Sequence, residues 1–212
     1  MKSKKIIYAT AFLGLGTIIS APSAFAMFGL GDSAGYVGGS MGQARYKSTP
    51  GVQSNSDSKD TGYKVFGGFQ LNPVVGLEAT YYDLGNFTGN SSAFNGSRLV
   101  PTNVTADATA WGVAAIITAP TNLFSVFGTG FGVFGKFGLV KSRLTTDASG
   151  IGFNSHQKES NTGSNFGIGA KYDFATNFSI RTEYERLNNV GARGTTGETQ
   201  IDFWSVGLAY KF

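Results

Sequence analysis

The 212-residue chain contains 17 basic and 13 acidic residues, 31 glycines, 18 phenylalanines and nine tyrosines, and it has no cysteine. The lack of cysteine excludes a disulfide framework, cysteine-ligated metal sites and a cysteine nucleophile. Only 14% of the residues are charged, and this composition suits many short strands, tight turns and aromatic belts better than a helical core.

The N-terminus has the three parts of a secretory signal peptide. Three lysines among the first five residues precede a mostly apolar run over 6–19, and Ala24 and Ala26 form the small-residue pattern of a cleavage site. The apolar run is shorter than the roughly 20 residues that a membrane-spanning helix needs. We therefore expect a signal peptide at 1–26 and a β-barrel domain at 27–212.

Cleavage changes the charge balance of the chain. Three lysines leave with the signal peptide, so the mature domain has 14 basic residues against 13 acidic ones. A nucleic-acid partner thereby loses its main support in the composition. Beyond the signal, no window holds 18 consecutive apolar residues, which excludes helical membrane spans.

Apolar and polar residues alternate at period two in several segments after residue 34, and this period predicts strands. In one such segment, Tyr63 and Val65 fall on one face and Lys64 on the other. The pattern places eight strands near 34–46, 61–71, 74–84, 109–119, 131–144, 164–174, 178–187 and 201–212. An even number of strands returns both termini to the same side of a membrane.

Alternation alone does not distinguish a soluble sandwich from a membrane barrel. The aromatic residues do, because the apolar faces carry rings near both ends, as at Phe178 and Tyr184 or Trp204 and Tyr210. Two rings about three pleats apart have the spacing of two interfacial girdles around an apolar band. We therefore predict an all-β fold, an eight-stranded antiparallel up-and-down transmembrane β-barrel.

The expected connections also differ between the two ends of this barrel. Those at Asn72-Pro73 and 175–177 are short, as periplasmic turns should be. The segment 120–132 fits a short turn poorly, and both an extended hairpin and a membrane-dipping turn stay open. Four long polar segments are expected to be external loops, at 47–60, 85–107, 145–164 and 188–199.

Three stretches of the chain, at 35–42, 71–78 and 181–184, resemble the membrane domain of the OmpA family. The Asn72-Pro73 turn followed by Gly76-x-Glu78 is the most specific of these features. That family usually continues into a periplasmic peptidoglycan-binding domain. Because the chain ends at Phe212, we expect no such domain and a plan closer to OmpX and the opacity-type surface proteins.

The resemblance implies a place in the cell outer membrane of a Gram-negative bacterium. We expect a monomer whose partners are outer-membrane lipid, lipopolysaccharide and the outer-membrane assembly machinery, with no nucleic acid and no cofactor. The expected role is structural or a surface interaction of the adhesion or serum-resistance type, in which the loops bind a host or cell-surface ligand.

With the aromatic face toward lipid, the opposite face sends charged side chains into the lumen. An eight-stranded barrel is only wide enough for its side chains to fill it, so these charges should pair with one another. The favoured interpretation is a polar plug. The alternative is a narrow gated porin-like ion channel, for which the resemblance to OmpA points to Glu78 and Arg181. The predicted interior set is Lys64, Glu78, Lys136, Lys171, Arg181, Glu183 and Glu185.

A lipid or peptide hydrolase is the remaining class of function. Such catalysis needs a nucleophile with an adjacent base, or an Asp/His pair that activates water. The single histidine, His156, lies beside Ser155 in a long polar segment without strand periodicity. We interpret it as a solvated loop residue and expect no enzyme and no metal site.

The final strand resembles the C-terminal targeting signal of outer-membrane barrels, carried here by Ser205, Gly207, Tyr210 and Phe212. This strand should close the sheet against the first one, because lipid cannot hydrogen-bond the N–H and C=O groups of an open edge.

Overall fold

The structure is a computed structural model that describes residues 35–47, 59–94, 99–119, 130–150, 153–190 and 199–212. The predicted signal peptide with Ala24 and Ala26 lies outside the described residues, as does most of the segment 120–132. The central parts of two predicted loops, 48–58 and 191–198, lie outside them as well.

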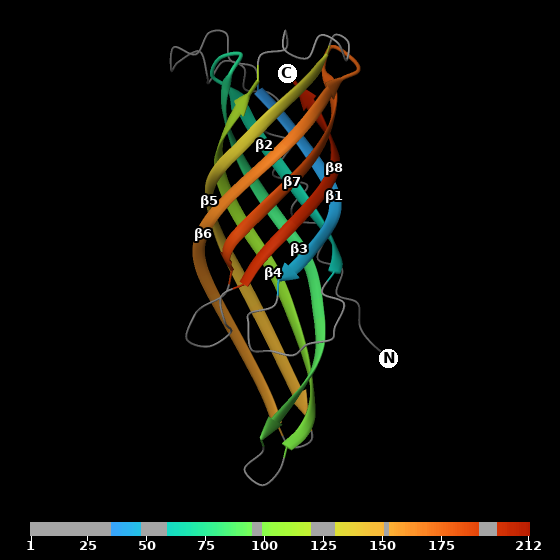
Figure 1. The fold of residues 1–212 in the computed structure, drawn as a ribbon, viewed down its shortest axis with the longest axis vertical. Helices are drawn as coiled ribbons and strands as arrows, with labels where there is room; N and C mark the ends of the chain where they lie inside the picture. Colours follow the sequence, from blue (N-terminus) through green and yellow to red (C-terminus); the bar gives the residue numbers. More distant parts are fainter. Residues whose placement is uncertain (1–34, 48–58, 95–98, 120–129, 151–152, 191–198) are drawn as a thin grey trace.

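The described residues form a closed antiparallel barrel in which each strand pairs with the next and the last pairs with the first (Figure 1). This confirms the predicted fold class and strand number. No helix in the described ranges is long and apolar enough to cross a membrane. The strands are β1 (Gly35–Lys47), β2 (Lys59–Gln70), β3 (Val75–Phe94), β4 (Leu99–Thr118), β5 (Phe131–Gly150), β6 (Phe153–Asp173), β7 (Phe178–Val190) and β8 (Thr199–Lys211).

The two faces of each strand have opposite environments, as the period of two requires. In β8, Trp204 and Leu208 are each 56% exposed, whereas Phe203 and Ser205 between and beside them are buried. Large apolar side chains are exposed in the same way along the other strands. A belt of large apolar side chains around the outside of a barrel is a lipid-facing surface.

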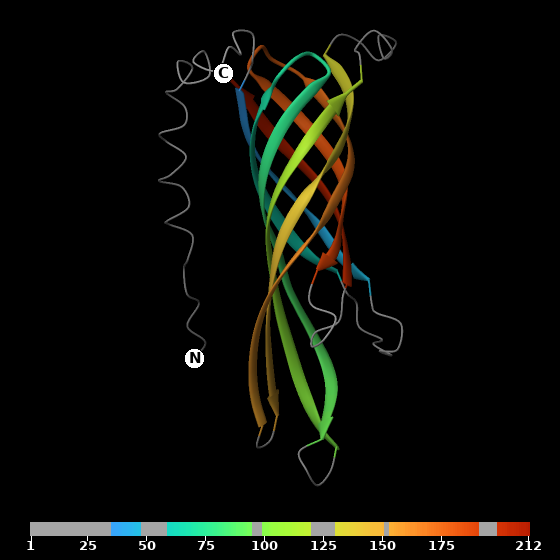
Figure 2. The ribbon, with the colours of Figure 1, turned by 90° about the vertical axis from the view of Figure 1, so that its left-hand side faces the viewer.

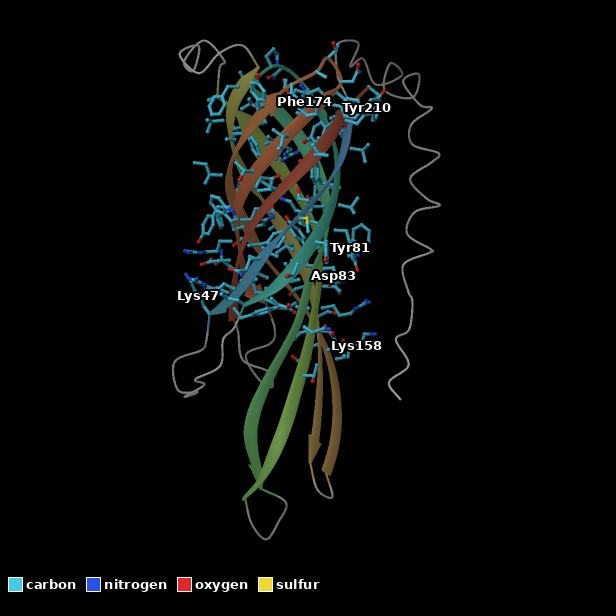
Figure 3. All side chains as sticks on the ribbon, turned by 90° about the vertical axis from the view of Figure 1, so that its right-hand side faces the viewer. Lys47, Tyr81, Asp83, Lys158, Phe174 and Tyr210 are labelled. Atoms are coloured by element: carbon cyan, nitrogen blue, oxygen red, sulfur yellow. The ribbon has the colours of Figure 1, made fainter. Side chains whose placement is uncertain are left out.

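Aromatic rings border the belt at both ends. Tyr81 and Trp111 lie 4.7 Å apart, and Phe178 lies 5.2 Å from Tyr210, measured between ring centroids. Figure 3 shows Phe174 and Tyr210 near the end with the short turns, and Tyr81 lower down, where long strands leave the barrel. These two sets of rings have the arrangement of the interfacial girdles that the sequence predicts.

The short turns are held by local hydrogen bonds. The Asn72 side chain accepts hydrogen bonds from the backbone N–H groups of Val74 (2.9 Å) and Val75 (2.8 Å), which fixes the turn between β2 and β3. This is the Asx-type turn that Asn favours, and the following Pro73 adds a fixed φ angle. These turns define the periplasmic end of the barrel.

Two of the four predicted long loops are wrong, because 85–107 and 145–164 are mostly strand. β3 continues to Phe94 and β4 begins at Leu99, while β5 continues to Gly150 and β6 begins at Phe153. Period-two alternation marks strands whose two faces meet different environments, and the sequence shows no such alternation over these two segments. His156 therefore lies in β6, where its backbone pairs with Asp147 of β5.

The long strands form one four-stranded sheet that continues beyond the rest of the barrel. The β4–β5 pairing extends to Thr102 and Gly150. The β3–β4 and β5–β6 hairpins, which extend below the other strands in Figure 2, therefore belong to a single sheet. β3 leaves its neighbour β2 at a bulge, where Gly85 has a φ of 76° that favours glycine. We call the part of β3–β6 beyond this bulge, which consists of 86–94, 99–107, 145–150 and 153–158, the external sheet.

Candidate functional site

Six of the seven charged residues predicted to face the lumen lie together in the middle of the barrel. They come from β2, β3, β5 and β7, where the inward-facing positions carry them, and none is more than 6% exposed. These six residues are Lys64, Glu78, Lys136, Arg181, Glu183 and Glu185.

The six side chains form a closed ring in which positive and negative groups alternate, and we call it the charge ring. Arg181 joins two carboxylates, since its Nη1 lies 2.8 Å from Glu78 Oε2 and its Nη2 lies 2.9 Å from Glu183 Oε1. Lys64 Nζ continues the ring, 2.9 Å from Glu183 Oε2 and 2.5 Å from Glu185 Oε2. Arg181, Lys64 and Glu183 thereby each have two partners of opposite sign.

Lys136 closes the charge ring on its remaining side. Its Nζ lies 2.7 Å from Glu185 Oε1 and 2.8 Å from Glu78 Oε1. The ring balances three positive groups with three carboxylates. Because an uncompensated buried charge is strongly unfavourable, closure of the ring is what allows six ionised groups to occupy one buried layer.

Neutral side chains support the ring. Tyr36 donates a hydrogen bond to Glu78 Oε2 (3.0 Å) and Tyr82 donates one to Glu185 Oε1 (2.8 Å). Asn165 in turn donates to the Tyr82 hydroxyl at 2.7 Å. These three residues are absent from the predicted set, which contains only charged groups. The period of two could have identified Tyr82, because it shares the inward face of β3 with Glu78.

Lys171, the seventh predicted residue, lies outside the charge ring. It faces inward near the periplasmic end and lines a cavity together with Arg181. Two further charged residues, Asp173 and Lys211, lie at the same end and form a salt bridge of 2.6 Å that the sequence prediction did not include.

An apolar layer fills the lumen on the external side of the ring. Its members are almost fully buried and come from β1, β3, β4, β5, β7 and β8. We call this layer the apolar plug, consisting of Ala44, Tyr82, Leu84, Ala108, Ala110, Val140, Leu187, Val190, Ile201 and Phe203. An ion that crossed the barrel would have to pass both the charge ring and the apolar plug.

The residues of the proposed assembly signal lie along the seam between β8 and β1. Gly207 pairs with Ser40, and a Cβ atom at Gly207 would come within 2.3 Å of the Gly39 carbonyl oxygen. Ser205 is buried in the lumen, and the Phe212 N–H donates a hydrogen bond to the Gly35 carbonyl at 3.0 Å. Recognition of this strand by assembly machinery stays a prediction.

Within the described ranges, no group of three or more His, Asp or Glu side chains is placed to hold a metal ion. The barrel, its lipid-facing belt with aromatic girdles and its filled polar interior define an integral outer-membrane β-barrel protein. Residues 10–212 match the family described as "Outer membrane protein beta-barrel domain". The chain belongs to this family, and its location is the outer membrane.

Relatives extend the comparison along the whole chain. Outer membrane protein A of Escherichia fergusonii is 28% identical over 219 residues, which cover 100% of this chain and 56% of that protein. Outer membrane protein A of Yersinia pseudotuberculosis is 26% identical over 218 residues, with the same two coverages. The chain thus spans about half the length of the curated relatives it matches.

Solved structures show the same fold at lower identity. Neisserial surface protein A aligns with a TM-score of 0.57 and 16% identity, covering 84% of this chain and 99% of that one. The outer membrane protein OprG of Pseudomonas aeruginosa aligns with a TM-score of 0.52 and 15% identity, covering 85% and 95%. These likenesses concern the fold alone.

Proposed function

We propose that this protein is a closed outer-membrane anchor that presents the external sheet to macromolecules at the cell surface, in an adhesion or serum-resistance role. The observation that carries the proposal is the continuous pairing of β3, β4, β5 and β6 beyond the barrel rim. A hydrogen-bonded sheet holds its shape where a polar loop would not, so it offers a preorganised binding surface.

The edges of the external sheet supply a binding chemistry. Over 87–94, β3 pairs only with β4, and over 153–158, β6 pairs only with β5 among the described residues. The outer side of each edge strand therefore presents backbone N–H and C=O groups to an added strand. Addition of an extended peptide to such an edge is an established mode of recognition between proteins.

The filled lumen supports an anchor more than a pore. The charge ring and the apolar plug occupy successive layers of the interior, and both are buried. A barrel of eight strands has room for its own side chains and little else. The stability of this core would serve to hold the external sheet in a fixed position.

Deletion of the outer ends of the β3–β4 and β5–β6 hairpins tests the proposal. One variant lacks 88–105, cut at the Thr88–Thr105 pair, and another lacks 148–155, cut at the Ala148–Ser155 pair. We expect each variant to insert and to keep the heat-modifiable mobility of a folded barrel, while bacteria that display it lose cell adhesion or serum survival. A matched variant that lacks 49–57 controls for loop shortening. Unchanged adhesion and survival in both hairpin variants would contradict the surface role.

A gated ion path is the second candidate. The observation that favours it is that Arg181 bridges Glu78 and Glu183, so it could release one carboxylate while keeping the other. For this function, Glu78→Ala should raise the single-channel conductance in planar bilayers, and Asp202→Ala, on the outer face, should not. Unchanged conductance in a correctly folded Glu78→Ala protein would contradict the gate.

The remaining parts of the proposal concern partners. We propose a monomer that contacts outer-membrane lipid and lipopolysaccharide through the apolar belt and that the outer-membrane assembly machinery inserts. The relatives reported above are outer-membrane barrel proteins, and we propose no catalytic role for His156.

A further inference from the structure

A cavity opens inside the barrel at its periplasmic end. Its volume is about 210 Å³, and its lining comes from seven of the eight strands, all except β3, and from the turn between β2 and β3. The polar residues of this lining are Tyr36, Gln70, Thr118, Lys171, Ser179, Arg181 and Lys211. The charge ring forms the inner boundary, since Arg181 belongs to both.

The charges around this cavity do not balance. From the middle of the barrel to its periplasmic end, the inward-facing side chains include five positive groups and four carboxylates. The charge ring is neutral in itself, and Lys211 is paired with Asp173 at 2.6 Å. The remaining positive charge is Lys171.

The Lys171 side chain lies along the barrel wall, with the Asp173 carboxylate in its neighbourhood but no salt bridge among the described residues. Its side chain lies across Gly132 of β5, where a Cβ atom would come within 3.2 Å of Lys171 Cε. Among the described residues its ammonium group has no salt bridge, and the nearby Asp173 is already engaged by Lys211. Because Gly132 has no side chain, the aliphatic part of Lys171 fits along the barrel wall. The Lys171 side chain thereby lies beside the cavity.

Lys171 also faces a second positive group. It pairs directly with Arg181 across β6 and β7, and both side chains line the cavity. Like charges directly opposite each other on one face of a sheet repel. Arg181 is only 6% exposed, and its Nε has no hydrogen-bond partner among the described residues, since its two Nη atoms serve Glu78 and Glu183.

We propose that this cavity binds one small oxyanion, such as inorganic phosphate, between Lys171 and Arg181. An anion there would offset the repulsion between the two cations and accept a hydrogen bond from the unpartnered Nε. The hydroxyls of Thr118 and Ser179 supply further donors in the lining. Because the barrel wall separates the cavity from lipid, the anion would enter from the aqueous periplasm.

Calorimetric titration of the refolded full chain with sodium phosphate tests the site. The protein is kept in an uncharged, phosphate-free detergent at constant ionic strength, so that the detergent offers no competing headgroup. We expect saturable binding of about one phosphate per chain. Lys171→Gln should weaken it by about tenfold or more, because hydrogen bonds to charged groups are the stronger class.

Lys141→Gln is the matched control, since it removes the same charge from an exposed, outward-facing position on β5. It should leave phosphate binding unchanged. A second measurement separates binding from folding: at one phosphate concentration, the urea midpoint of the wild type and of Lys141→Gln should rise equally, and that of Lys171→Gln should rise by less. Absence of saturable binding, or equal weakening by both substitutions, would overturn the proposal.

Discussion

Arg181 and Glu78 meet across the full width of the barrel lumen, with 2.8 Å between Nη1 and Oε2. They belong to β7 and β3, and three strands separate these two on either route around the barrel. The guanidinium group also lies over the rings of Phe66 (4.3 Å) and Phe134 (4.7 Å), measured from Cζ to each ring centroid. One side chain thus connects opposite walls and packs against two more strands.

Breaking this connection on one side should be costly. We expect Glu78→Gln and Arg181→Met each to lower the free energy of unfolding by about 3–5 kcal/mol, because each leaves buried charge without its partner. The double variant should lose less than the sum of the two. Urea unfolding in detergent measures all three. Arg186→Met is the control, since its pair with Asp202 is on the outer face and should be worth about 0–1 kcal/mol. Strict additivity of the two interior changes would contradict a direct coupling.

The apolar plug should depend on its largest members. Phe203 is fully buried and packs edge-on against Tyr82, with ring centroids 6.4 Å apart. Phe203→Ala should lower the free energy of unfolding by about 3–5 kcal/mol, since it leaves a cavity that neighbours in a closed barrel cannot fill. Phe137→Ala removes a ring that is 57% exposed to lipid, where acyl chains can replace it. Equal losses in the two variants would show that the plug is not specially packed.

The seam between β8 and β1 leaves no space for a side chain at Gly207. Gly207→Ala places a methyl group against the Gly39 carbonyl and Ser40, so the two strands must move apart. We expect a loss of about 1–3 kcal/mol from overpacking and a smaller heat-modifiable fraction on gels. Gly135→Ala is the control, because nothing lies within 4 Å of its added Cβ position. Normal folding of the Gly207 variant would argue against a tight seam.

The lipid-facing belt can be tested by introducing a charge. Ile168 is 60% exposed on the outer face of β6, between the two sets of aromatic rings. Ile168→Arg should destabilise the inserted barrel by about 2–4 kcal/mol, the cost of a cation near the bilayer midplane. Thr176→Arg, in the exposed turn between β6 and β7, should have little effect. Refolding into lipid vesicles at increasing urea gives both values, and equal stabilities would place Ile168 outside the membrane.

The period of two predicted the fold because, within the membrane, the two faces of a strand meet different environments. It thereby assigned the inward faces that carry Lys64, Glu78 and Arg181. The same reasoning failed for 85–107 and 145–164, where Ser, Thr, Asn and Gly predominate and apolar residues do not alternate with polar ones. Composition suggested loops there, whereas the pairings of β3 with β4, β4 with β5 and β5 with β6 show a sheet.

The partners within the charge ring could not be predicted from the sequence. Which carboxylate meets Lys136 depends on the stagger between strands that are far apart in the chain, and alternation gives no information about stagger. The roles of Tyr36 and Tyr82 were missed for a related reason. Tyrosine is typical of the outer girdles, and its place on the inward face becomes meaningful only once Glu78 and Glu185 are located nearby.

The pairing of β1 with β8 should be the last of the eight strand pairings to form during folding. Seven of the eight strand pairs join neighbours in the sequence, so their hairpins close short loops, whereas the last pair must bring together opposite ends of the domain. The charge ring draws on β2, β3, β5 and β7, so its carboxylates stay hydrated until the sheet curls. Dehydration of the lumen and closure of the barrel should therefore be one late, cooperative step.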